Sequence, residues 1–145
     1  MHRVTRSALL SYSARQIYDL VNQVEYYPRF LPWCYEAEVH ERTETYQRAT
    51  LGMAVRPLRK HFTTVNSMRP GERIDMRLEN GPFRDLLGVW LFEPLGDNGT
   101  KVSVDVSFEF SSRVLDFSLG SRLENLFGGL IDAFRDRAKQ VYGAG

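Results

Sequence analysis

The chain has 145 residues and a formal net charge of +1, with 43% hydrophobic and 26% charged residues. This length fits one domain that buries roughly 70% of its unfolded surface. The balanced charge gives no acidic tail and no strongly basic face, which argues against a DNA-binding protein. The one cysteine, Cys34, excludes an intramolecular disulfide and a CxxC metal or redox motif.

The first part of the chain predicts one strand, two short helical segments and two further strands. Residues 4–10 are typical of a strand. Ser13 and Gln16 form a capping box ahead of an apolar stripe at positions 17, 20, 21 and 24, which predicts a short helix. A second short helix or turn is expected before Pro32. From Cys34 the apolar period becomes two, which predicts two strands joined across 43–45.

The second part predicts four more strands and a C-terminal helix. Two strands are expected at 58–68 and 74–79, before the turn residues Asn80-Gly81-Pro82. Residues 86–95 are apolar on both faces, so we expect a central strand covered on both sides. After a hairpin signal, valine or phenylalanine occupies every even position from 102 to 110, which predicts a strand with one buried face. Apolar residues then recur at spacings of three and four from Leu123 to Val141, which predicts one helix of about twenty residues.

These elements predict an α+β fold in which a curved antiparallel sheet of about seven strands wraps around a long C-terminal helix, because no helix separates consecutive strands after residue 34. Such layers often enclose an apolar cavity, of roughly 300 to 1,000 Å³ for a drug-sized ligand. We expect its walls to be the apolar strand positions that face the helix and the buried stripe of the helix. They are Leu51, Met53, Met76, Leu78, Val104, Val106, Phe108, Phe110, Phe127, Leu130 and Phe134.

Five short segments carry a resemblance to a known family. They are FLPWC (30–34), KHFTT (60–64), GPF (81–83) with the Trp, Phe and Pro at 90, 92 and 94, FEF (108–110) and AFRDRAKQVY (133–142). Together they resemble the coenzyme Q-binding protein family of START-like, polyketide cyclase-type domains, which includes the RatA branch of ribosome association toxins. The chain departs from the family pattern at Asn80, and at Gly128 and Gly129 inside the expected helix.

The resemblance implies a helix-grip fold of the START or Bet v 1 type and a binding protein rather than an enzyme. The implied ligand is ubiquinone or a similar isoprenoid lipid, held without an obligatory cofactor and delivered to respiratory complexes. The alternative is a RatA-type toxin that binds the large ribosomal subunit and blocks subunit association. A cyclase or lyase is the third possibility. It would need an acid or base in the cavity, and the only candidates, His61 and Asp105, are expected to face solvent.

Several residues allow two interpretations. Trp33 and Phe83 could lie at the cavity mouth or simply pack in the core. The two adjacent helix glycines could let the helix bend as a lid or pack closely on the sheet. The basic cluster Arg56, Arg59 and Lys60 could contact RNA phosphates or an anionic membrane, or could protect a solvated strand edge from aggregation.

Neither a metal site nor a membrane span is expected. The three histidines show no metal-binding spacing, and Cys34 is expected to be an unreactive thiol. The first residues form no apolar leader, and the longest uncharged apolar run, 86–92, is too short to cross a bilayer. We expect a cytoplasmic protein, with the inner-membrane surface as an alternative location.

Overall fold

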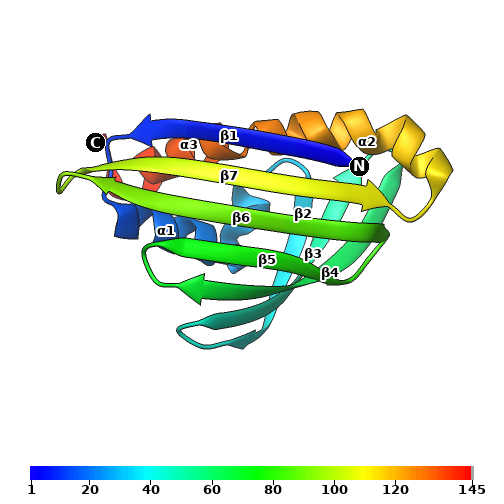
Figure 1. The fold of residues 1–145 in the computed structure, drawn as a ribbon, viewed down its shortest axis with the longest axis horizontal. Coiled ribbons are helices and arrows are strands. Elements are labelled where there is room, and N and C mark those ends of the chain that lie inside the picture. Colours follow the sequence, from blue (N-terminus) through cyan, green and yellow to red (C-terminus); the bar gives the residue numbers. More distant parts are fainter. Residues whose placement is uncertain (145) are drawn as a thin grey trace.

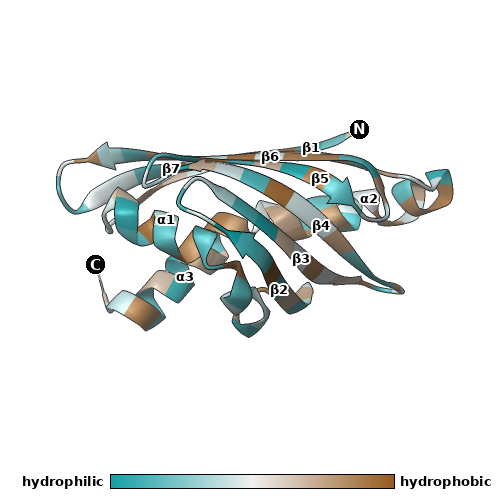
Figure 2. Ribbon diagram, turned by 90° about the horizontal axis from the view of Figure 1, so that it is seen from below, coloured by the Kyte–Doolittle hydropathy of each residue, from teal (hydrophilic) through white to brown (hydrophobic). Residues whose placement is uncertain are grey.

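The computed structural model describes residues 1–144, which form one curved sheet with helices against its inner face (Figures 1 and 2). The elements in chain order are β1 (His2–Leu10), α1 (Ala14–Asn22), the 3₁₀ helix η1 (Val24–Arg29), β2 (Cys34–Arg42), β3 (Tyr46–Val55), β4 (Leu58–Arg69), β5 (Arg73–Asn80), β6 (Phe83–Leu95), β7 (Gly99–Phe110), α2 (Arg113–Gly128) and α3 (Leu130–Tyr142).

The seven strands lie in the order β1-β7-β6-β5-β4-β3-β2, and each neighbouring pair is antiparallel. Register shifts interrupt the pairing of β2 with β3, of β4 with β5 and of β6 with β7. Irregularities of this kind bend a strand and increase its twist, which helps the sheet to curve around the helices. The predicted α+β class, antiparallel sheet and helix-grip arrangement are confirmed.

Local sequence signals explain the elements that start the chain and form its core. The Ser13 hydroxyl accepts a hydrogen bond from the Gln16 backbone at 3.2 Å, and the Gln16 side chain accepts one from the Ser13 backbone at 2.9 Å. This is the predicted capping box, and α1 follows it. In β7 the predicted alternation is confirmed, since all five apolar side chains from Val102 to Phe110 are at most 2% exposed.

The prediction that β6 is covered on both sides is wrong. The strand is central, between β5 and β7, and Leu86 and Trp90 are buried on its inner face. On the outer face Leu87 is 47% exposed, and Val89 and Leu91 are only half-buried. All helices lie on the inner side (Figure 2), so apolar residues on the outer face reflect strand propensity rather than a second layer.

The C-terminal helix is longer than predicted and is broken in two. It begins at Arg113 instead of near Leu123, and Gly129 separates α2 from α3. The Gly129 amide bonds the carbonyl of Leu126, three residues back, at 3.2 Å, which interrupts the regular helical ladder. The predicted stripe is buried as far as Ala138, whereas Val141 is 48% exposed because the last turn extends past the sheet.

Candidate functional site

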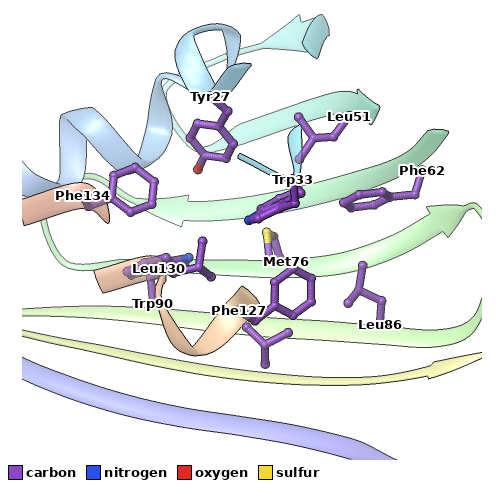
Figure 3. A pocket seen from close by; sticks show the side chains of 11 residues that line it. Tyr27, Trp33, Leu51, Phe62, Met76, Leu86, Trp90, Phe127, Leu130 and Phe134 are labelled. Atoms are coloured by element: carbon purple, nitrogen blue, oxygen red, sulfur yellow. The ribbon is translucent and has the colours of Figure 1, made fainter. Parts of the chain in front are cut away.

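An apolar cavity lies between the sheet and the helices, where the prediction placed one, but it is much smaller (Figure 3). Its volume is about 50 Å³. A ligand site for a drug-sized molecule needs roughly 300 to 1,000 Å³, so the predicted size is wrong for this structure. The residues that line it are Tyr27, Trp33, Leu51, Phe62, Met76, Leu86, Trp90, Val106, Phe127, Leu130 and Phe134.

Aromatic rings account for the small volume. Trp33 packs edge-on against Phe127 with ring centroids 5.5 Å apart, and Trp90 packs edge-on against Phe134 at 5.4 Å. Figure 3 shows these rings converging on the cavity from the sheet, from the segment before β2 and from the helices. Aromatic pairs at these distances attract each other by more than the burial of their surface area alone would give. The walls therefore close on one another in this conformation.

The lining offers little polar chemistry. It contains no carboxylate, histidine or cation. The Tyr27 hydroxyl donates to the backbone carbonyl of Val21, and burial raises the pKa of Tyr27 above its ordinary value. General acid–base catalysis needs a titratable group near the operating pH within reach of the substrate, and the described lining supplies none. The described lining is therefore apolar apart from the Tyr27 hydroxyl and the indole N–H groups of Trp33 and Trp90.

Six of the eleven predicted wall residues line the cavity, and five do not. Met53, Val104, Phe108 and Phe110 are buried in the core away from it, and Leu78 is half-buried. Alternation identifies the face of a strand but not the position along it, so it could not separate Val106, which lines the cavity, from Val104 and Phe108 on the same face of β7. Whether the six lining residues bind a ligand stays a prediction. The six residues that do line the cavity are Leu51, Met76, Val106, Phe127, Leu130 and Phe134.

The two residues expected at the cavity mouth have different places. Trp33 is 5% exposed and forms part of the wall. Phe83 does not line the cavity; it is 4% exposed and stacks on Phe110 with ring centroids 4.9 Å apart. Sequence reasoning missed four wall residues. The signal for Tyr27 was the aromatic-rich segment before Pro32, and the inward phase of β4 and β6 could have shown Phe62, Leu86 and Trp90.

The basic cluster Arg56, Arg59 and Lys60 is exposed at the hairpin between β3 and β4. The Arg59 guanidinium carbon lies 3.8 Å from the ring centroid of Tyr35. Arg122 of α2 donates to the backbone carbonyl of Arg56. Within residues 1–144 no carboxylate forms an ion pair with any of the three cluster cations. The cluster is therefore a set of positive charges available to an anion.

The residues considered for catalysis lie on the outer face of the sheet, away from the cavity. Asp105 pairs with Arg3 at 2.7 Å, and hydrogen bonding from Arg3 lowers the pKa of this carboxyl. His61 is exposed and contacts Glu36. Burial raises the pKa of the Cys34 thiol to about 11, which keeps it protonated near neutral pH.

The described chain holds neither a metal-binding cluster nor a membrane-spanning helix. Residues 1–144 contain no group of three or more His, Cys, Asp or Glu side chains that could hold a metal ion. In the same range no helix is both long and apolar enough to span a membrane.

Comparison with known proteins places the chain among related sequences. Residues 10–135 match the family model described as polyketide cyclase / dehydrase and lipid transport. A Pseudomonas aeruginosa protein named ribosome association toxin RatA is 45% identical over 140 residues, which cover 97% of each chain. The mitochondrial coenzyme Q-binding protein COQ10 of Drosophila melanogaster is 31% identical over 131 residues, which cover 88% of this chain and 52% of that protein.

The fold comparison agrees with the sheet topology. The crystal structure of the Zhui aromatase/cyclase from Streptomyces sp. R1128 superimposes with a TM-score of 0.85 and covers 99% of this chain and 98% of that one. The sequences are 18% identical, so this likeness concerns the fold alone.

Proposed function

Since this chain belongs to the polyketide cyclase / dehydrase and lipid transport family, we propose that it acts in that family as a RatA-type protein that binds the large ribosomal subunit and hinders subunit association. The observation that carries the proposal is the 45% identity, over 97% of both chains, to a protein named ribosome association toxin. The more distant COQ10 protein matches through only 52% of its length.

Two structural features support this choice over a lipid carrier. The cavity of about 50 Å³ is far below the roughly 300 Å³ that a drug-sized ligand needs. The cluster Arg56, Arg59 and Lys60 carries three exposed charges without ion-pair partners in the described chain. Arginine presents a planar fork of donors that matches phosphate oxygens, so such a cluster suits ribosomal RNA.

Sedimentation of purified ribosomal subunits with this protein tests the proposal. We expect the protein to migrate with the large subunit, and we expect its addition before subunit mixing to reduce the peak of associated ribosomes. Neutralising the cluster with Arg56→Gln, Arg59→Gln and Lys60→Gln should weaken binding. The slope of log affinity against log salt should flatten by about 0.9 for each duplex phosphate that the variant no longer neutralises.

Arg77→Gln is a matched control, because Arg77 is also exposed and unpaired in the described chain but lies on β5. The control should keep the binding and salt dependence of the wild type. If the wild-type protein does not migrate with large subunits at any salt concentration, the proposed function is wrong.

Ubiquinone binding is the second candidate, and the apolar cavity between the sheet and α3 favours it. A quinone would need the cavity to expand about sixfold, from about 50 Å³ to the lower limit of a drug-sized site. Movement of α3 about Gly129, the residue that separates it from α2, would provide one route. The bound lipid would then serve respiratory complexes. A cyclase or lyase activity receives no support from the uncharged lining.

Lipid extraction and mass spectrometry of protein purified from its native host tests the second candidate. A co-purified quinone would support it. Leu130→Asp should abolish quinone binding, since a charge in an apolar wall is strongly unfavourable, and circular dichroism must show that the variant folds. Leu130→Phe fills the cavity without adding charge and should also reduce binding. If the purified protein contains no quinone, and if added quinone binds equally to the wild type and to both variants, this candidate is contradicted.

A further inference from the structure

The outward face of α2 exposes two large apolar side chains. Val114 is 75% exposed and Phe117 is 94% exposed, and they lie three residues apart, on the same side of the helix. Single exposed apolar residues need no explanation, whereas this neighbouring pair near the start of α2 offers a partner an apolar contact. The rest of this outward face consists of exposed polar residues and carries no carboxylate. These residues are Ser118, Ser121, Arg122 and Asn125.

The two acidic side chains of α2, Asp116 and Glu124, both contact His2 of β1. Asp116 Oδ1 lies 3.2 Å from His2 Nε2, and Glu124 Oε2 lies 3.1 Å from His2 Nδ1. His2 also stacks on Phe108, with ring centroids 5.0 Å apart. The imidazole of β1 therefore draws both carboxylates toward the sheet. We define the α2 face as the exposed residues Val114, Phe117, Ser118, Ser121, Arg122 and Asn125, of which Arg122 is the charged one. Both carboxylates border it, since Asp116 shares a depression with Phe117 and Glu124 lies two turns after Phe117.

The α2 face is continuous with the basic cluster of the β3–β4 hairpin. Arg122 belongs to the face and donates to the backbone carbonyl of Arg56, which belongs to the cluster. On the other flank, Phe117 shares a surface depression with Arg84 and Arg113, together with Glu109 and Asp116. Glu109 is partly neutralised there, because it contacts Arg84 at 3.4 Å. Figure 1 shows the start of α2 at the end of the sheet where the N-terminus lies.

We propose that the α2 face and the basic cluster form one RNA-binding surface, in which arginines contact phosphates and Phe117 stacks on an unpaired base. This inference rests on the proposed ribosome binding. Proteins that bind single-stranded RNA segments combine a positive track for the backbone with aromatic rings on which bases stack. Arg56 and Arg122 supply the track, and the nearly fully exposed Phe117 ring supplies the stacking surface.

The polar side chains that accompany Phe117 and Arg122 on the α2 face favour RNA over a lipid bilayer as the partner. Ser118 and Ser121 lie between Phe117 and Arg122 on the exposed surface, and Asn125 lies one turn after Ser121 on the same face. Their hydroxyl and amide groups would lose water without gaining partners in a hydrocarbon layer. Against RNA they can bond sugar hydroxyls and phosphate oxygens. A membrane-binding face of this size would be expected to carry apolar residues at these positions.

Co-sedimentation of the full chain with purified large ribosomal subunits, over a range of salt concentrations, tests this surface. Phe117→Ser should weaken binding by about 5- to 150-fold, the range for loss of one base stack, and should leave the salt slope unchanged. The double variant Arg56→Gln, Arg122→Gln should flatten the slope by up to about 1.4, at about 0.7 per single-strand phosphate. Both changes are at exposed positions, and thermal melting verifies the fold.

Leu9→Ser and Lys101→Gln are the matched controls. Leu9 is 72% exposed and faces Lys101 across β1 and β7, at the other end of the sheet. Both controls should bind within about twofold of the wild type, as expected for positions outside the contact surface.

Three outcomes would overturn the inference, and they are distinguishable. If the wild type does not sediment with subunits, the proposed function fails and the surface fails with it. If the wild type binds and the Phe117 and arginine variants bind equally well, the ribosome is bound by another surface. If Phe117→Ser binds subunits normally but loses binding to vesicles of phosphatidylserine and phosphatidylcholine, the face contacts lipid instead.

Discussion

Gly120 is the position in α2 where a single methyl group is expected to disturb the attachment of the helix to β1. A Cβ atom there would lie 2.0 Å from Nε2 and 2.3 Å from Cε1 of His2. Atoms cannot approach so closely, so the His2 ring must leave its place. It then gives up its contacts with Asp116 and Glu124 and its stack on Phe108.

The expected magnitude follows from opposing terms. With the imidazole protonated, both ring nitrogens can donate, and we take about 1.5 kcal/mol, the lower value for a hydrogen bond to a charged group, for each of the two partly exposed contacts. Alanine instead of glycine stabilises a helix by about 1 kcal/mol. Gly120→Ala should therefore lower the free energy of unfolding by about 2 kcal/mol. In a protein that already carries His2→Ala, Gly120→Ala should raise the free energy of unfolding by about 1 kcal/mol.

Urea denaturation of the wild type, of Gly120→Ala, of His2→Ala and of the double variant gives a double-mutant cycle. We expect a coupling free energy of about 3 kcal/mol between the two positions, near the upper end for residues in contact. Gly128→Ala serves as a control, because a Cβ there meets only the flexible end of Arg6, at 3.2 Å from Nη2. If Gly120→Ala has the same effect with and without the His2 ring, the imidazole contact does not hold α2 on the sheet.

Three further predictions concern stability and reactivity. Gly128→Ala with Gly129→Ala should stabilise the protein by up to about 2 kcal/mol in chemical denaturation, because the nearest atom to a Cβ on Gly129 is 3.6 Å away; lower stability would mean that the break is required for packing. Hydrogen bonding from Arg42 lowers the pKa of Glu25 below its ordinary value of 4.5, so this pair stabilises the fold above that pH and the gain is lost as pH falls through the folded-state pKa. Glu25→Gln should therefore lose less stability on acidification than the wild type in unfolding curves from pH 6 to 3, and equal slopes would contradict this. Because burial raises the pKa of Cys34 to about 11, its thiol should react with iodoacetamide at pH 8 much more slowly in native than in urea-unfolded protein; equal rates would refute it.

The sequence predicted the sheet well because most of its strands have one buried face. In β7, every second residue from Val102 to Phe110 had to be apolar, and period-two patterns of this strength are hard to mistake. In β6, apolar residues on the outer face, such as Leu87, suggested a second covering layer that does not exist. Strand propensity and burial produce the same residue types there, so the pattern could not separate them.

The candidate site was only partly predictable, for a different reason. Cavity walls depend on where strands and helices cross, and the side-chain period carries no information on that. Phe108 has the correct phase but packs under His2 and Phe127, away from the space that Trp90 lines. The exposed ring of Phe117 was not recognised either, because the expected helix began near Leu123 and left this residue in a loop.

The position of the first residue has a practical consequence for experiments. The Met1 amino group lies 3.5 Å from Glu109, and Glu109 borders the depression that contains Phe117 and Arg84. An affinity tag fused before Met1 would therefore emerge beside the surface whose binding is to be measured, and would replace the terminal charge with a peptide bond. At the other end, Tyr142 donates to the Gln16 carbonyl at 3.0 Å, and the C-terminal end of α3 lies at the opposite end of the sheet from α2's first turn (Figure 1). A C-terminal tag is the better choice, and a comparison of the two fusions would itself report on which end of the molecule meets its partner.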